Sequence, residues 1–129
     1  MRFDPFADAL THIKNSDFVA KKSCTVMPAS KLLVNTLKIL LDEKYIAGYE
    51  LKTKANMKTA VIKLNGMLTN LRAIKPRFAV SYLNLEKFEK RYLPSRNVGL
   101  LILSTPKGLK THVVAKREKI GGRLLAYVY

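Results

Sequence analysis

The chain has 129 residues, of which 48% are hydrophobic, and 24 lysines and arginines against 9 acids give it a formal net charge of +15. This composition excludes a disordered chain and predicts a folded protein that binds a polyanion. The only cysteine, Cys24, allows no disulfide within the chain and favours a reducing, intracellular setting. The start of the chain lacks the apolar core of a signal peptide, and no run reaches the roughly 20 apolar residues of a membrane span, so we expect no membrane partner.

The first predicted element is a helix that begins at Asp4 and Pro5, an N-cap acceptor followed by a residue tolerated at the first helical position. Its apolar residues recur at helical spacing and predict one buried face, formed by Phe6, Leu10 and Ile13. Three polar residues fall on or beside the other face, namely Thr11, Lys14 and Asn15. From the pattern alone, these three are expected to be solvated.

A short strand is predicted over residues 23–27 and is ended by Pro28, and a helix capped by Ser30 is predicted over residues 31–45. The buried face of this helix is predicted to carry Leu33, Leu37, Leu40 and Leu41. Lys31 in its first turn opposes the helix dipole. An anion bound at this helix end would offset that cost. A solvated lysine with no role in binding is an equal alternative.

Residues 49–53 and 59–64 alternate as two strands of an antiparallel ribbon, joined by a polar turn around Ala55 and Asn56. Asn65 and Gly66 mark another turn, and we place the boundary between two domains there, at residues 1–66 and 67–129. No flexible linker separates the two halves, so we expect them to pack together.

The second half carries the stronger positive field, with 13 basic and 3 acidic residues against 11 and 6 in residues 1–65. It is predicted to contain strands over residues 71–75 and 78–82, separated by Pro76, and a short helical turn over residues 85–89. The charged segment 85–96 is either a structural clamp over the sheet or a phosphate-facing surface that presents Lys90, Arg91 and Arg96.

Residues 98–103 form a continuous apolar run that predicts a strand buried on both faces. The loop that follows contains Pro106 and Gly108, which suit a tight turn, and it presents three polar side chains: Ser104, Thr105 and Lys107. Two hydroxyls beside a cation suit RNA, whose 2′-OH groups and unpaired bases are read by small polar groups. An ordinary turn between a strand and a helix is the alternative.

Thr111 is predicted to cap the next helix, with Val113 and Val114 facing inward. Gly121 and Gly122 then turn the chain into a final strand over residues 124–128.

Catalysis and metal binding are not expected. His12 and His112 lie far apart with no cysteine or carboxylate at ligand spacing, and the basic half offers no set of catalytic residues and no glycine-rich phosphate loop. We therefore predict no catalytic residues, cofactor, metal or small-molecule substrate. Phosphate charge alone does not separate RNA from DNA, so a general nucleic-acid-binding architectural protein remains an alternative, as does a subunit that only bridges proteins.

Four motifs in register along the whole chain resemble the universal small-subunit ribosomal protein eight family: DPFADALTHIKN near the start, MPASKL at 27–32, STPKG at 104–108 and GGRLLAYVY at the end. The segments KPRF and EKFEKRYLP resemble its archaeal and eukaryotic branch. The resemblance implies an α+β fold, with a small α/β amino-terminal domain packed on a β-rich carboxy-terminal domain that has one short helix.

The resemblance also implies a structural role in the small ribosomal subunit, in the cytoplasm, beside neighbouring small-subunit proteins. The chain would bind the central domain of small-subunit rRNA early in assembly. Residues carried over as RNA contacts are Ser104, Thr105, Lys107 and Gly108, with the turn at Gly121 and Gly122 beside them, and Thr11, Lys14, Asn15 and Lys31 in the first half. Many members have a glycine where this chain has Lys119, so the end of the preceding helix is expected to differ.

Overall fold

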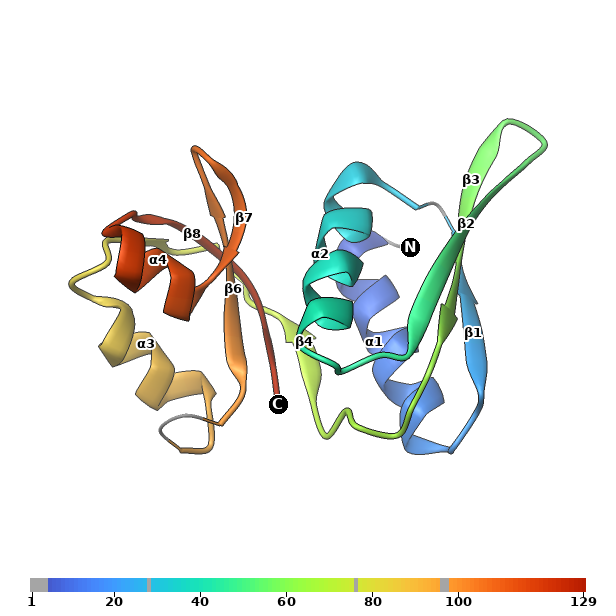
Figure 1. Ribbon diagram of the computed structural model, residues 1–129, viewed down its shortest axis with the longest axis horizontal. Helices are drawn as coiled ribbons and strands as arrows, with labels where there is room; N and C mark the ends of the chain where they lie inside the picture. Colours follow the sequence, from blue (N-terminus) through green and yellow to red (C-terminus); the bar gives the residue numbers. More distant parts are fainter. Residues whose placement is uncertain (1–4, 28, 76, 96–97) are drawn as a thin grey trace. The chain divides into compact units, whose positions relative to one another are not determined.

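A computed structural model describes residues 5–27, 29–75, 77–95 and 98–129 (Figure 1). The chain forms two compact units, Met1–Leu71 and Arg72–Tyr129. Each unit combines helices with an antiparallel sheet, which confirms the predicted α+β class. The predicted N-cap Asp4, the strand-ending Pro28, the separating Pro76 and the candidate Arg96 lie outside the described residues.

The first unit follows the predicted order of elements. They are α1 (Pro5–Phe18), β1 (Ser23–Val26), α2 (Lys31–Asp42), β2 (Gly48–Lys54) and β3 (Met57–Lys63). Its three strands are arranged β1-β3-β2, and both pairs are antiparallel. Figure 1 shows both helices on one face of this sheet.

The apolar faces predicted for the first two helices form the core of this unit. The side chains that are at most 1% exposed there include Leu10, Ile13, Leu33, Leu37, Leu40 and Ile62. Ser30 caps α2 as predicted, because its hydroxyl accepts a hydrogen bond of 3.2 Å from the N–H of Leu33. Leu41 is only half-buried, and Thr36 takes a fully buried place instead.

The loop after β3 is tied to the end of α1. The Asp17 carboxylate is buried, and its two oxygens accept hydrogen bonds from the N–H groups of Gly66 (2.9 Å) and Leu68 (3.0 Å). The loop that follows Gly66 therefore lies within the first unit, which ends at Leu71.

The second unit is built on a five-stranded sheet. Its elements are β4 (Leu71–Ala73), β5 (Ala79–Val80), α3 (Leu85–Tyr92), β6 (Leu100–Thr105), β7 (Gly108–Thr111), α4 (His112–Glu118) and β8 (Gly122–Val128). The strand order is β4-β8-β6-β7, and β5 pairs with β8. The unit thus has two short helices, where the sequence indicated one helix and a single helical turn.

Strand β6 lies between β8 and β7 in this sheet, and Leu100 to Leu103 are all buried, as the apolar run predicted. Its bounds were wrong by two residues at each end. Val98 is 45% exposed and lies before the strand, while Ser104 and Thr105 belong to the strand because they pair with β7. Strand β7 itself was missed by the sequence analysis.

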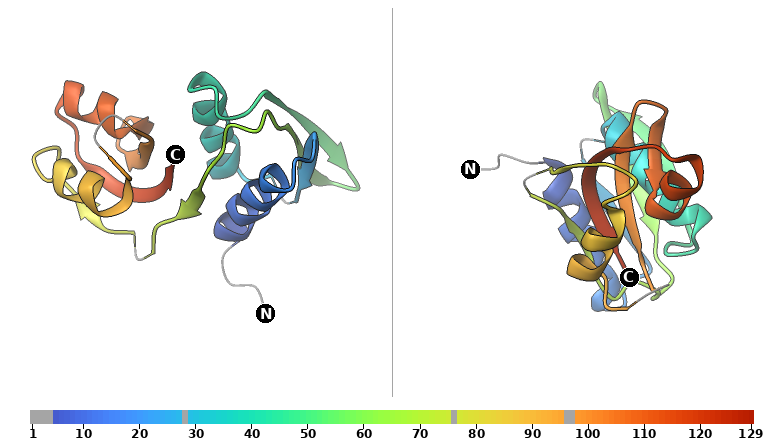
Figure 2. Two further views of the ribbon diagram at one scale, coloured as in Figure 1. Left: turned by 90° about the horizontal axis from the view of Figure 1, so that it is seen from below. Right: turned by 90° about the vertical axis from the view of Figure 1, so that its left-hand side faces the viewer.

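Helices α3 and α4 pack on one face of the sheet (Figures 1 and 2). Leu85 and Phe88 of α3 and Ala115 of α4 meet Leu101, Leu103 and Leu124 in one cluster. Thr111 caps α4 as predicted, since its hydroxyl accepts a hydrogen bond of 3.4 Å from the Val114 N–H. The expected inward position of Val113 was wrong. It is 54% exposed, and the buried face of this short helix consists of His112 and Ala115.

Three helices end in the same way, on a residue in the left-handed conformation. After α1, α2 and α4 these residues are Ala20 (φ 62°), Lys44 (φ 65°) and Lys119 (φ 56°). In each case the next residue donates its N–H back to the helix, as Ile120 does to the Ala115 carbonyl at 2.9 Å. This is the Schellman motif, in which glycine usually occupies the left-handed position. Each of these three residues has a Cβ, so its left-handed backbone costs roughly 1 kcal/mol or more.

Candidate RNA-binding surface

The predicted RNA-binding loop is the tight turn of a β-hairpin, not a connection from strand to helix. Thr105 of β6 pairs with Gly108 of β7, so that only Pro106 and Lys107 form the turn. Gly108 has a φ of 106°, which confirms the expected need for glycine. The sequence predicted a loop that leads directly to α4, because β7, with only four residues, has no alternating pattern of its own.

Thr105 holds the turn together. Its hydroxyl donates to the Gly108 carbonyl at 2.7 Å and accepts from the Lys107 N–H at 3.2 Å. The residue is only 8% exposed, so the expectation of a hydroxyl exposed at the turn was wrong. Both hydrogen bonds stay within the turn, and Thr105 therefore sets the shape of the backbone from which its neighbours project.

Ser104 and Lys107 are the exposed polar side chains of this turn. Within the described chain, neither the Ser104 hydroxyl nor the Lys107 ammonium group has a partner. A hydroxyl and a cation thus stand free on either side of a fixed residue. Such a pair can contact a sugar hydroxyl and a phosphate oxygen of one backbone.

The glycine pair lies where three strands approach one another. A Cβ at Gly122 would collide with the backbone carbonyl oxygen of Ser104, and a Cβ at Gly121 would lie 2.7 Å from the carbonyl oxygen of Val80 in β5. Because backbone atoms cannot move aside easily, the sheet requires glycine at both positions. The structure therefore brings Gly122 against Ser104 and Thr105, whereas Gly121 contacts β5.

Arg123 is a residue of this region that the sequence analysis did not select. It lies directly opposite Ser104 in the β6–β8 register, so the two side chains project from the same face of the sheet. Its side chain is exposed, and its Nη1 donates to the Arg77 carbonyl at 3.3 Å. Arg123 is the one charged residue of the segment GGRLLAYVY, and this could have indicated its exposed position.

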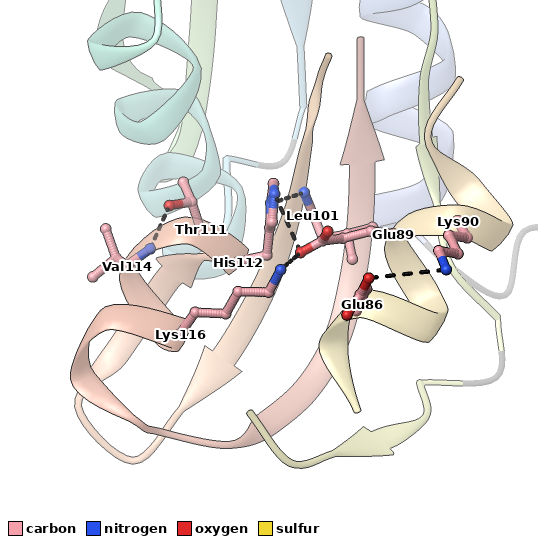
Figure 3. Close-up of polar contacts among 8 residues, drawn as sticks. All are labelled: Glu86, Glu89, Lys90, Leu101, Thr111, His112, Val114 and Lys116. Carbon is pink, nitrogen blue, oxygen red and sulfur yellow. Dashed lines mark hydrogen bonds and ion pairs between the residues drawn. The ribbon is translucent and has the colours of Figure 1, made fainter. Parts of the chain in front are cut away.

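The base of the hairpin is fastened by a histidine. His112 is buried, and its Nδ1 accepts a hydrogen bond of 3.0 Å from the N–H of Leu101 in β6 (Figure 3). Its Nε2 faces the Glu89 carboxylate at 3.6 Å, and Lys116 forms an ion pair with the same carboxylate. Burial lowers the pKa of His112 below its ordinary value, although Glu89 opposes that shift. The neutral imidazole is thus the form that can accept the Leu101 N–H.

The contacts of Lys90 and Arg91 in the charged segment that includes α3 favour a structural clamp over a phosphate-facing surface. Lys90 forms an exposed ion pair with Glu86 at 3.9 Å. The Arg91 guanidinium lies over the rings of Phe78 and Tyr92, at 5.4 Å from each ring centre. Arg91 thus covers the aromatic edge of the core as well as carrying charge.

The candidates of the first unit occupy two helices. Thr11 and Asn15 are exposed on the side of α1 away from Leu10 and Ile13, while Lys14, one turn after Leu10, lies beside the buried face and is half-buried. The Thr11 hydroxyl donates to the Ala7 carbonyl at 3.0 Å. Lys31 is the exposed first residue of α2.

The described residues contain no group of three or more His, Cys, Asp or Glu side chains that could hold a metal ion. Among the helices described, none combines the length and the apolar character needed to cross a membrane.

A pre-shaped hairpin turn that presents the exposed Lys107 on a strongly basic chain suits a structural protein that binds nucleic acid. Residues 4–129 match the family model described as ribosomal protein S8. The chain is 44% identical to the small ribosomal subunit protein uS8 of Methanococcoides burtonii over 126 residues, which cover 98% of this chain and 97% of that relative. The chain therefore belongs to the ribosomal protein S8 family, which confirms the resemblance seen in its motifs.

Proposed function

We propose that this chain binds the central domain of small-subunit rRNA early in assembly, with the β6–β7 turn as its main contact. As a member of the S8 family it is a structural constituent of the small ribosomal subunit in the cytoplasm, where it binds rRNA and adjoins other ribosomal proteins, and it is not an enzyme. The finer assignments are the rRNA domain and the residues that contact it.

The observation that carries the proposal is the fixed shape of the turn. Thr105 closes the turn with two internal hydrogen bonds, and Gly122 lets β8 lie against its base. Ser104 and Lys107 are exposed from this frame, and Arg123 lies opposite Ser104. Because the frame is ordered before binding, little conformational entropy is lost when RNA binds.

Ser104, Lys107 and the backbone at Gly108 are the proposed direct contacts, and Thr105, Gly121 and Gly122 position them. In the first unit, Thr11, Lys14, Asn15 and Lys31 are proposed as a second region of contact. The exposed positions of Thr11, Asn15 and Lys31 support this assignment.

The turn is tested by binding to an rRNA fragment at several salt concentrations. We expect log K against log salt to have a slope of about −0.7 to −0.9 per phosphate contacted. Lys107→Ala should make that slope shallower by about one contact. Ser104→Ala should lower affinity by about 1 kcal/mol and leave the slope unchanged.

Lys58→Ala is the matched control, because Lys58 is an exposed lysine in β3, beside the turn of the other hairpin. Its affinity should stay within about 0.5 kcal/mol of the parent. If Lys107→Ala and Ser104→Ala also bind like the parent, the turn is not the main contact. Equal affinity for fragments of the central domain and of other rRNA domains would contradict the choice of domain.

A further inference from the structure

Phe18 is an aromatic side chain that the fold leaves in water. It is the last residue of α1, and it is 84% exposed. Two further apolar side chains in this part of the unit, Val19 and Met67, are each 61% exposed. An exposed apolar group of this kind marks an interaction site more often than an isolated exposed residue does.

Phe18 lies on the same face of α1 as the proposed RNA contacts. Thr11, Lys14 and Phe18 are spaced i, i+3 and i+7, which places them in one row along the helix, with Asn15 beside that row. Thr11 and Phe18 are exposed, and Lys14, one turn after Leu10, lies at the border of the buried face and is half-buried. The ring therefore stands at the end of a polar, basic row.

The charges around the ring are positive. Lys14 lies one turn before Phe18 on the same face, and Lys21 and Lys22 follow it and are exposed. The adjacent acid, Asp17, is buried and is held by the N–H groups of Gly66 and Leu68. A polyanion can thus approach the ring without meeting the Asp17 carboxylate.

The backbone that carries the ring is held in place at the end of α1. The Lys21 N–H donates to the Ser16 carbonyl at 3.0 Å, and the Ala20 N–H donates to the Asp17 carbonyl at 3.1 Å. These hydrogen bonds close the end of α1 immediately after Phe18. The same Asp17 carboxylate holds the loop that carries Met67 against this end of the helix.

We propose that Phe18 is a stacking platform for one unpaired base of the small-subunit rRNA. Lys14, Lys21 and Lys22 neutralise the flanking phosphates, and Val19 and Met67 border the stacked base. An aromatic face combined with nearby cations is the arrangement that binds single-stranded RNA without reading its sequence. RNA fits better than a protein partner because the residues that flank the ring along the chain supply three lysines, while the Asp17 carboxylate next to it is buried. This inference rests on the proposed rRNA binding.

Tryptophan substitution tests the stacking directly, because the chain contains no tryptophan. Phe18→Trp places a single tryptophan at the site, and its fluorescence can be excited selectively in the presence of the six tyrosines. Leu83→Trp is the matched control, since Leu83 is 76% exposed in the second unit. On addition of a small-subunit rRNA transcript, we expect strong quenching for Phe18→Trp and little for Leu83→Trp.

Affinity for the same transcript separates stacking from general apolar contact. Phe18→Ala and Phe18→Leu should both weaken binding by about 10-fold, the size expected for one stacked base, with the salt slope unchanged, and Phe18→Tyr should bind like the parent.

Parent-like binding by Phe18→Ala, with tight binding by the parent, would overturn this inference and leave the proposed function intact. If Phe18→Ala binds the transcript normally but is lost from assembled subunits, a protein neighbour covers the ring instead. A parent protein that does not bind the transcript would overturn both proposals.

Discussion

Two β-hairpins in the described part of the chain have turns of the same length, but different contacts hold these turns in shape. In the first unit, Lys54 pairs with Met57, and the turn residues Ala55 and Asn56 both have positive φ, at 51° and 62°. Neighbouring β1 pairs with β3 only as far as Ala60, so the end of this hairpin extends beyond the sheet (Figure 1). The described side chains from Leu51 to Lys58 are all exposed.

The β6–β7 hairpin is supported at its turn, along its side and at its base. Thr105 closes the turn, Gly122 of β8 lies against the Ser104 carbonyl, and His112 accepts the Leu101 N–H. The β2–β3 hairpin follows from local backbone preferences, because two residues with positive φ match the twist of the strands. Side-chain contacts therefore fix the geometry of the β6–β7 turn, as the proposed binding surface requires.

The largest effect is expected from Gly122→Ala. Its new methyl group would collide with the Ser104 backbone carbonyl, and we expect the free energy of unfolding to fall by about 3 kcal/mol. Gly48→Ala is the matched control, because a Cβ there would have no neighbour within 4 Å among the described residues. Its stability should change by less than about 0.5 kcal/mol. Urea denaturation of both variants measures the difference, and equal stabilities would show that β8 can shift away from β6 at no cost.

The next effect is a loss of stability at mildly acidic pH. Burial lowers the pKa of His112 in the folded chain below its value of about 6.5 in the unfolded chain, so the unfolded chain binds the proton more tightly. The contribution of His112 to stability is therefore complete above pH 6.5 and is lost as the pH falls toward the lowered value. One proton gives a slope of at most about 1.4 kcal/mol per pH unit.

Unfolding measured between pH 7.5 and about 5.5 checks this effect before most carboxylates titrate. In His112→Asn the amide oxygen can still accept the Leu101 N–H and does not titrate, so its stability should depend less on pH than that of the parent. His12→Asn removes an exposed histidine from α1 and serves as the control. If His112→Asn and His12→Asn show the same pH dependence, protonation of His112 does not affect the hairpin.

The third effect concerns the turn itself. Thr105→Val keeps the shape of the side chain but removes both hydrogen bonds within the turn, so stability should fall by about 1 kcal/mol and rRNA affinity should fall with it. Thr105→Ser keeps the hydroxyl and should restore much of both. A variant Thr105→Val that keeps full stability and loses affinity would show that this hydroxyl contacts RNA directly.

Local signals were sufficient to predict most of the first unit. Ser30 caps α2, and the polar turn at Ala55 and Asn56 separates two alternating strands, so each element is specified by residues close together in the sequence. The same applies to the position of Gly108, because positive φ is a property of one residue. The presence of a tight turn at the candidate site was therefore predictable.

The remaining features depend on residues that are distant in the sequence. Asp17 binds the backbone of Gly66 and Leu68, which lie 49 and 51 residues away, so no local pattern reveals that the loop belongs to the first unit. Strand β7 is defined by its pairing with β6, and the pairing of Ser104 with Arg123 depends on the register of β8. The buried state of Thr105 follows from these pairings, which is why its hydroxyl was expected to be exposed.

The smallest effect is a gain in stability at the helix end that departs from the family pattern. Lys119 occupies a left-handed conformation with a φ of 56°, where the resemblance led us to expect glycine in many members. Lys119→Gly should raise the free energy of unfolding by roughly 0.5 to 1 kcal/mol, because glycine adopts this conformation without the steric cost of a Cβ. Lys119→Ala removes the charge and keeps the strain, so it should not be stabilised. If the lysine charge contributes to rRNA binding, both variants should bind rRNA more weakly than the parent and to the same extent. Equal stabilities of Lys119→Gly and Lys119→Ala would show that the left-handed backbone at this position is not strained.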